Sequence, residues 1–204
     1  MCAVNGHNLE AVEYILKAGA DPNAIPPGGE SPLITATLWL SWDPSRAEVI
    51  PGIVQTPLKH GADPNKSLPG GRTALVFAAS TNDTAAMSLL LKAGADPNVV
   101  TDDGTTAFAD AVQSGQLNMA KYLIAHGART EAVDNRSGRI PLHLAVLQGE
   151  LPMVEVVFPV AADRSAVDCM GMTPLDIALR CGHTRIAELL RNGGAKPRSP
   201  RQNR

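Results

Sequence analysis

A five-residue motif, Gly-Ala-Asp-Pro-Asn, occurs three times in this chain and constrains its architecture more than any other feature. The copies are Gly19–Asn23, Gly61–Asn65 and Gly94–Asn98, so the interval between the first two is longer than the interval between the last two. The shorter interval, about 33 residues, far exceeds the period of a helix or a strand. It predicts one supersecondary unit stacked on copies of itself, because such a unit buries its apolar face only against a neighbour.

A second segment recurs in the same register and predicts the helices of each unit. It begins with a hydroxyl residue suited to a helix N-cap, or with Ile140, and Pro or Ala follows. The five copies, which follow the same intervals, are Ser31–Ala36, Thr73–Ala78, Thr106–Ala111, Ile140–Ala145 and Thr173–Ala178. A second apolar stretch then ends near a Gly, which favours the left-handed conformation at a helix end, and Asp-Pro-Asn favours a turn. Each unit is therefore predicted to contain two helices and a turn.

These segments resemble those of the ankyrin-repeat family. The family's Thr-Pro-Leu-His-x-Ala motif is nearly complete at Ile140–Ala145 and Thr173–Ala178, and its Gly-His pair stands at Gly6-His7 and Gly182-His183. The resemblance covers roughly residues 3 to 195. It implies an all-α ankyrin-repeat solenoid of stacked helix pairs, with projecting hairpin fingers and a concave surface made by the fingers and first helices. It also implies a protein-binding scaffold rather than an enzyme, although a fold alone does not give function.

The repeat pattern predicts one ankyrin-repeat domain over residues 1–195. Its units span about 1–28, 29–67, 68–100, 101–133, 134–167 and 168–195, and a basic tail at 196–204 is expected to be disordered. The first unit is only half present, because Gly6–Lys17 supplies its second helix alone. This edge has three open explanations: an unconventional cap, a fragment of a longer chain, or a surface that meets a partner, including a second copy of the chain.

The second unit is longer than its neighbours because of an insertion at about Leu40–Glu48. Both tryptophans of the chain, Trp39 and Trp42, lie in or beside this insertion. Either they fold back over the gap between the two helices, or they form an exposed hot spot for a partner. In the fifth unit, Pro159 replaces a helical residue and should shorten the second helix.

Composition excludes several classes of function. The net charge is −2, so no global field attracts nucleic acid or a membrane. The start of the chain lacks the basic and apolar parts of a signal peptide, and no apolar run is long enough to cross a membrane. The three cysteines are too scattered for a disulfide framework or a zinc module. With no nucleotide or metal motif, we expect no cofactor, no metal and an intracellular, cytoplasmic protein.

Asp110 breaks the rule of the repeat. It occupies the position held by Phe77, Leu144 and Ile177 in other units, an apolar position expected to face the stack. A carboxylate there needs a partner, since burying it alone costs several kcal/mol. A hydrogen-bonded structural role and a functional polar centre both remain open. An enzyme on this scaffold would use Asp110 with His143, on adjacent first helices, as its acid–base pair.

The exposed finger and inner-helix positions predict where a protein partner binds. The surface mixes acidic and basic fingers, and Arg and Met are frequent at interfaces. The residues expected at its centre are Arg72, Asp102, Asp103, Arg136, Arg139 and Met172, with Trp39 and Trp42 as a second candidate region. The alternatives are the enzyme described above and an adaptor subunit whose N-terminal edge packs on a larger assembly.

Overall fold

A computed structural model describes residues 9–27, 29–38 and 50–198 of the chain. The chain forms two compact segments, an N-terminal segment of residues 1–101 and a C-terminal segment of residues 102–204. The predicted insertion with Trp39 and Trp42 lies outside the described residues. Within the described residues the secondary structure is helical, with no strand and one isolated bridge between Ser67 and Thr73. The predicted all-α class is confirmed.

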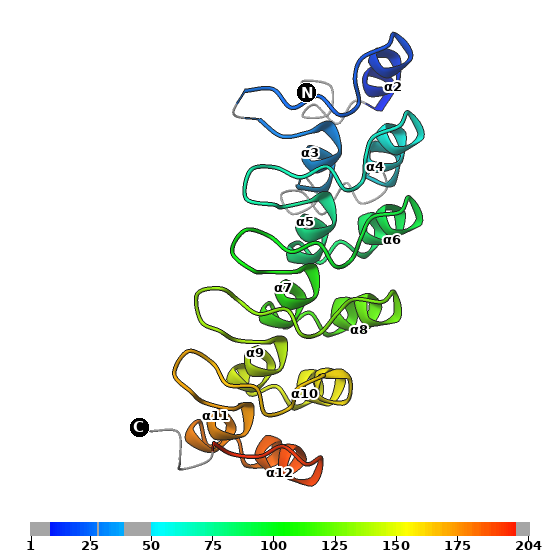
Figure 1. Ribbon diagram of the computed structural model, residues 1–204. Coiled ribbons are helices and arrows are strands. Elements are labelled where there is room, and N and C mark those ends of the chain that lie inside the picture. Colours follow the sequence, from blue (N-terminus) through cyan, green and yellow to red (C-terminus); the bar gives the residue numbers. More distant parts are fainter. Residues whose placement is uncertain (1–8, 28, 39–49, 199–204) are drawn as a thin grey trace. The chain divides into compact units, whose positions relative to one another are not determined.

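The helices of the N-terminal segment form an inner and an outer row (Figure 1). The inner helices are α3 (Pro32–Leu38) and α5 (Ala74–Ser80), and the outer ones are α2 (Leu9–Lys17), α4 (Ile50–Lys59) and α6 (Thr84–Lys92). Helix α3 packs against α4 and α5, while α4 packs against α2 and α6. Helices α3 and α5 thus pack on the outer helices of their own units, α4 and α6, and helices also pack on the next unit in their row, as α2 does on α4.

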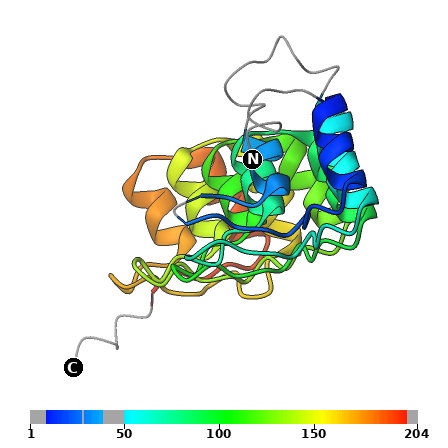
Figure 2. The same ribbon diagram turned by 90° about the horizontal axis from the view of Figure 1, so that it is seen from above.

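The C-terminal segment repeats this arrangement. Its inner helices are α7 (Ala107–Gln113), α9 (Pro141–Gln148) and α11 (Pro174–Arg180), and its outer ones are α8 (Leu117–Ala125), α10 (Leu151–Val157) and α12 (Thr184–Asn192). Each inner helix packs on its own outer helix, and α9 also contacts α7 and α11. Large side chains from both rows are fully buried between the layers, among them Phe108, Met119, Leu142, Leu175 and Leu190. The loops that form the fingers leave the helices of this segment on the same side (Figure 2).

Proline acts on helix α10 as the sequence predicts. The helix ends at Val157 after seven residues, and a 3-10 turn, η3 (Phe158–Val160), carries Pro159. The other outer helices of this segment, α8 and α12, have nine residues each. The ring and the missing N–H of Pro159 explain the early end.

Asn residues join successive copies of the Gly-Ala-Asp-Pro-Asn motif. The side chain of Asn23 accepts the Asp63 N–H at 2.7 Å and donates to the Gly61 carbonyl at 3.2 Å. Asn65 makes the same two bonds to Asp96 and Gly94, at 2.7 and 3.1 Å. An amide is suited to this position because it carries both a donor and an acceptor. The first two copies of the motif therefore each bond to the next copy as well as forming a turn within their own unit.

Candidate functional site

The fingers of the C-terminal segment are held by hydrogen bonds within and between them. The finger over residues 134–139 is closed by the Asp134 N–H, which donates to the Arg139 carbonyl at 2.9 Å. The next finger is closed in the same way from Asp168 to Met172, at 3.0 Å. Neighbouring fingers are joined by the Asn135 N–H on the Asp103 carbonyl and by the Cys169 N–H on the Ser137 carbonyl. The fingers therefore present a pre-organised surface.

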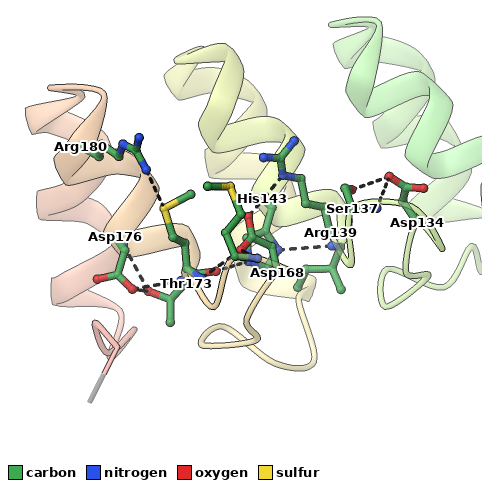
Figure 3. Close-up of polar contacts among 11 residues, drawn as sticks. Asp134, Ser137, Arg139, His143, Asp168, Thr173, Asp176 and Arg180 are labelled. Atoms are coloured by element: carbon green, nitrogen blue, oxygen red, sulfur yellow. Dashed lines mark hydrogen bonds and ion pairs between the residues drawn. The ribbon is translucent and has the colours of Figure 1, made fainter. Parts of the chain in front are cut away.

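Asp134 shapes the turn of its finger at Arg136 and Ser137. Its carboxylate accepts the backbone N–H of Arg136 at 3.0 Å and that of Ser137 at 3.2 Å, and it also accepts the Ser137 hydroxyl (Figure 3). The hydroxyl of Ser137, followed by the N–H of Arg136, lowers the pKa of the Asp134 carboxyl below its usual value. Asp134 is therefore ionised at neutral pH and holds the turn through three donors.

Asp168 plays the corresponding role in the next finger, but it is buried. Its Oδ1 accepts the N–H groups of Met170 and Met172, both at 2.9 Å. Its Oδ2 lies 3.5 Å from the Arg139 Nε (Figure 3), a separation at which charges attract but a hydrogen bond is poor. The Asp168 side chain is fully buried and that of Arg139 is 27% exposed. This ion pair links two fingers and orients the guanidinium.

His143 is a structural residue of helix α9. Its side chain is fully buried, and its Nδ1 accepts the Ile140 N–H at 3.3 Å. The proton then lies on Nε2, which donates to the Met172 carbonyl at 3.1 Å. Burial lowers the pKa of the imidazole, so the ring is neutral at pH 7. His143 thus supplies one half of a capping box, in which the N3 side chain accepts the N-cap N–H, while Ile140, which lacks a hydroxyl, cannot supply the other half.

The last finger is fixed to helix α11 by Thr173 and Asp176. The Asp176 carboxylate accepts the Thr173 N–H at 3.0 Å and its hydroxyl at 2.8 Å, while the same hydroxyl accepts the Asp176 N–H. This reciprocal arrangement is a capping box. The carboxylate also accepts the Arg198 N–H at 3.0 Å, so the first residues of the predicted tail contact this repeat. Residues 199–204 lie outside the described part of the chain.

A hollow of about 120 Å³ opens between helices α7 and α9 and the fingers beside them. Five of its lining residues are polar, and Ala109 and Leu144 supply apolar surface. The lining consists of Gly104, Thr105, Ala109, Gln113, Asp134, Ser137, Arg139 and Leu144. Beyond the contact of its Nε with Asp168, the Arg139 side chain has no hydrogen bond to any described residue, so its terminal nitrogens remain available to a ligand.

Models of the ankyrin repeat match the chain over most of its length. The model for ankyrin repeats in three copies matches residues 47–134 and 129–200, and the model for a single ankyrin repeat matches residues 1–25. The chain belongs to the ankyrin-repeat family.

Curated relatives contain the same repeat as a small part of larger proteins. The chicken nuclear factor NF-kappa-B p105 subunit is 38% identical over 85 residues, which are 41% of this chain and 9% of the relative. The human ARF GTPase-activating protein GIT1 is 33% identical over 78 residues, or 38% of this chain and 10% of the relative. The mouse p105 subunit is 37% identical over 87 residues, or 41% and 9%. The chain thus matches only about a tenth of the length of each of these relatives.

The ankyrin fold places the predicted partner-binding residues at two depths. Asp102 and Arg136 are exposed at fingertips, and Asp103 is half-buried. Arg72, Arg139 and Met172 were expected to be exposed, but this expectation is wrong, because each is half-buried. The Arg72 guanidinium stands 5.8 Å from the centre of the Phe77 ring, and the Met172 sulfur lies 3.5 Å from an Arg180 nitrogen (Figure 3).

The ankyrin repeat also changes the interpretation of Asp110. Its side chain was expected in an apolar position facing the stack, but it is half-buried, as are Phe77 and Leu144 at the same position of other repeats, whereas Ile177 is buried. In helix α7 this position is therefore open enough for a carboxylate. His143 cannot act with it as an acid–base pair in this arrangement, because both ring nitrogens already bond to backbone groups.

Neither a metal site nor a membrane-spanning helix is found in the described part of the ankyrin-repeat chain. Across residues 9–27, 29–38 and 50–198, no three His, Cys, Asp or Glu side chains lie close enough to hold a metal ion. The helices described there are also too short or too polar to cross a lipid bilayer. Sequence reasoning missed Asp134 and Asp168, although both stand directly before a Gly-containing fingertip, where a carboxylate can accept nearby N–H groups.

Proposed function

We propose that this ankyrin-repeat chain is a scaffold that binds a protein partner through the fingers and inner helices of its C-terminal segment. One observation carries the proposal. Asp134, His143, Asp168 and Asp176 use their polar atoms to hold the fingers in place, while the side chains of Asp102, Arg136 and Met170 remain exposed above them. A rigid frame with exposed mixed side chains suits protein recognition, because little conformational freedom is lost on binding.

The family supports a binding role over catalysis. Ankyrin repeats generally mediate interactions between proteins and are typically non-enzymatic. The candidate acid–base pair of the enzyme alternative lacks an available imidazole. Ankyrin-repeat proteins are commonly intracellular, and Cys169 and Cys181 are free thiols, so we infer an intracellular, cytoplasmic setting in which thiols stay reduced. Nucleic acid is not the proposed partner, because the net charge is −2.

A peptide library displayed on phage and selected against the full chain tests the proposal. Binding of recovered peptides is then measured by calorimetry with the wild type, Arg136→Ala and Met170→Ala. An interface Arg is often worth about 2 kcal/mol, so at least one variant should weaken binding by about tenfold or more. Both side chains are exposed, and their loss should change stability by at most about 0.5 kcal/mol.

Lys121→Ala is the matched control. Lys121 is an exposed cation on the outer helix α8, away from the fingers. It should leave peptide affinity unchanged. Peptides that depend on Lys121 while tolerating both finger variants would overturn the assignment of the binding surface.

A further inference from the structure

The hollow beside Arg139 has a lining that discriminates between ligand groups by charge. Arg139 contributes a cation, Asp134 contributes an anion, and Gln113 contributes a neutral amide. Gln113 is an exposed residue whose side chain has no hydrogen bond to the described residues. The hollow therefore offers donors and acceptors side by side without an excess of either charge.

From this lining we infer that the hollow is a subsite for the side-chain carboxamide of Asn or Gln on the partner. The inference rests on the proposed function and names the chemistry of one contact. The guanidinium of Arg139 is held by Asp168 on its Nε edge, which leaves its two terminal nitrogens as donors. These donors need an acceptor when a partner excludes water from the hollow.

The ligand group that accepts from Arg139 must also be compatible with Asp134. The Asp134 carboxylate has about four lone-pair sites, and three protein donors occupy it, so about one lone-pair site remains for a ligand donor. A carboxylate ligand would pair with Arg139, but it would add a third negative charge to Asp134 and Asp168 around one guanidinium. An ammonium ligand has no acceptor for Arg139 and would face its positive charge. A carboxamide provides a carbonyl for Arg139 and an NH₂ for Asp134 or Gln113, and it adds no charge.

The size of the hollow agrees with this ligand. A dry protein cavity of about 150 Å³ holds benzene, with its six heavy atoms. By proportion, a hollow of 120 Å³ has room for about five heavy atoms. A primary amide with its adjoining carbons has four or five. Ala109 and Leu144 supply the apolar contact for those carbons.

The test uses peptides from the selection whose affinity depends on Arg136. Alanine scanning identifies any peptide residue whose contribution disappears in Gln113→Ala. That residue is then made Gln, Glu, Lys or Leu in four synthetic peptides, and each is titrated calorimetrically into the full chain. The Gln peptide should bind at least tenfold more tightly than the Glu and Lys peptides. If the selected peptide carries Asn at this position, the Asn peptide should show the same preference.

Arg139→Lys is the decisive variant, because it keeps a cation near Asp168 but loses the planar fork. It should reduce the preference for Gln over Glu to less than threefold, whereas Lys121→Ala should leave it unchanged. Equal or tighter binding of the Glu peptide would overturn the carboxamide assignment, as would an unaltered preference in Arg139→Lys. Peptides that depend on Arg136 but on neither Gln113 nor Arg139 would refute this inference alone. Recovery of no peptide that depends on the fingers would refute the proposed function and this inference with it.

Discussion

The ion pair between Arg139 and Asp168 gives the sharpest prediction on stability. Arg139→Met keeps most of the aliphatic side chain but removes the only ion-pair partner of Asp168 Oδ2 among the described residues. Asp168 is fully buried, so this change leaves a carboxylate oxygen without water or a partner. Breaking a buried ion pair from one side generally costs about 3–5 kcal/mol.

The structure indicates a cost at or just below the lower limit of that range. Asp168 Oδ1 keeps its two backbone donors, the Nε–Oδ2 separation is 3.5 Å, and Arg139 is 27% exposed. We therefore expect a loss of about 2–3 kcal/mol in the free energy of unfolding for Arg139→Met. For a chain of this size that corresponds to a fall of about 4–12 °C in Tm. Arg139→Lys should lose less than about 1 kcal/mol, since a cation remains.

Urea denaturation followed by circular dichroism measures these losses, with the double variant Arg139→Met/Asp168→Asn completing a cycle. Asp168→Asn alone should cost about 1–2 kcal/mol, because an amide NH₂ then faces the guanidinium. The double variant should be more stable than the sum of the two losses predicts, since neither partner is left alone. Raising the salt concentration should change the Arg139→Met loss little, because the anion is buried. A loss below about 0.5 kcal/mol for Arg139→Met would refute the role of this pair.

Three further predictions concern buried or bridging polar groups. Burial lowers the pKa of His143 in the folded chain, so below about pH 6.5 the unfolded chain takes up a proton on this residue before the folded chain does. The contribution of His143 to stability should therefore be constant above that pH and fall below it, and urea denaturation at pH 7.5 and 5.5 should show a smaller fall for His143→Gln than for the wild type. Asp83 caps helix α6 by accepting the Ala86 N–H at 2.9 Å, while burial raises the pKa of its carboxyl. At pH 7, Asp83→Ala should therefore lower the free energy of unfolding by about 1 kcal/mol, and Asp83→Asn should lower it by less. A larger loss for Asp83→Asn would contradict the capping role. Asn65→Ala removes both bonds to the next motif and should lower the free energy of unfolding by about 1–2 kcal/mol by the same assay, and an unchanged value would show that the Asn links contribute nothing.

The sequence predicts the architecture because a repeat period of this length corresponds to one supersecondary unit that stacks on its neighbours. The nearly constant interval between units, the hydroxyl residues before helices and the Gly after them are local signals, and the helices begin and end close to them. The short helix α10 followed from Pro159 for the same reason. These signals act within a few residues of the chain, so no knowledge of packing is required.

The burial of side chains on the fingers and inner helices could not be predicted in this way. Arg139 was expected to be exposed because it occupies a finger position of the repeat. Instead, its guanidinium lies beside the buried Asp168 of the next finger. Asp110 was expected to be buried because its counterparts are apolar, but that helix edge is half-open. The Asn links between motifs were also missed. The orientation of Arg139 and the Asn links depend on contacts about one period away, which a single repeat does not display.

The central claim is that the fingers of the C-terminal segment bind a protein. The most direct measurement is the change in amide chemical shifts when a phage-selected peptide is added to the ¹⁵N-labelled chain. The account predicts that the shifted amides cluster at residues 102–105, 134–139 and 168–172 and along the inner helices α7, α9 and α11. A cluster on the outer helices α8, α10 and α12, with the finger amides unmoved, would contradict it.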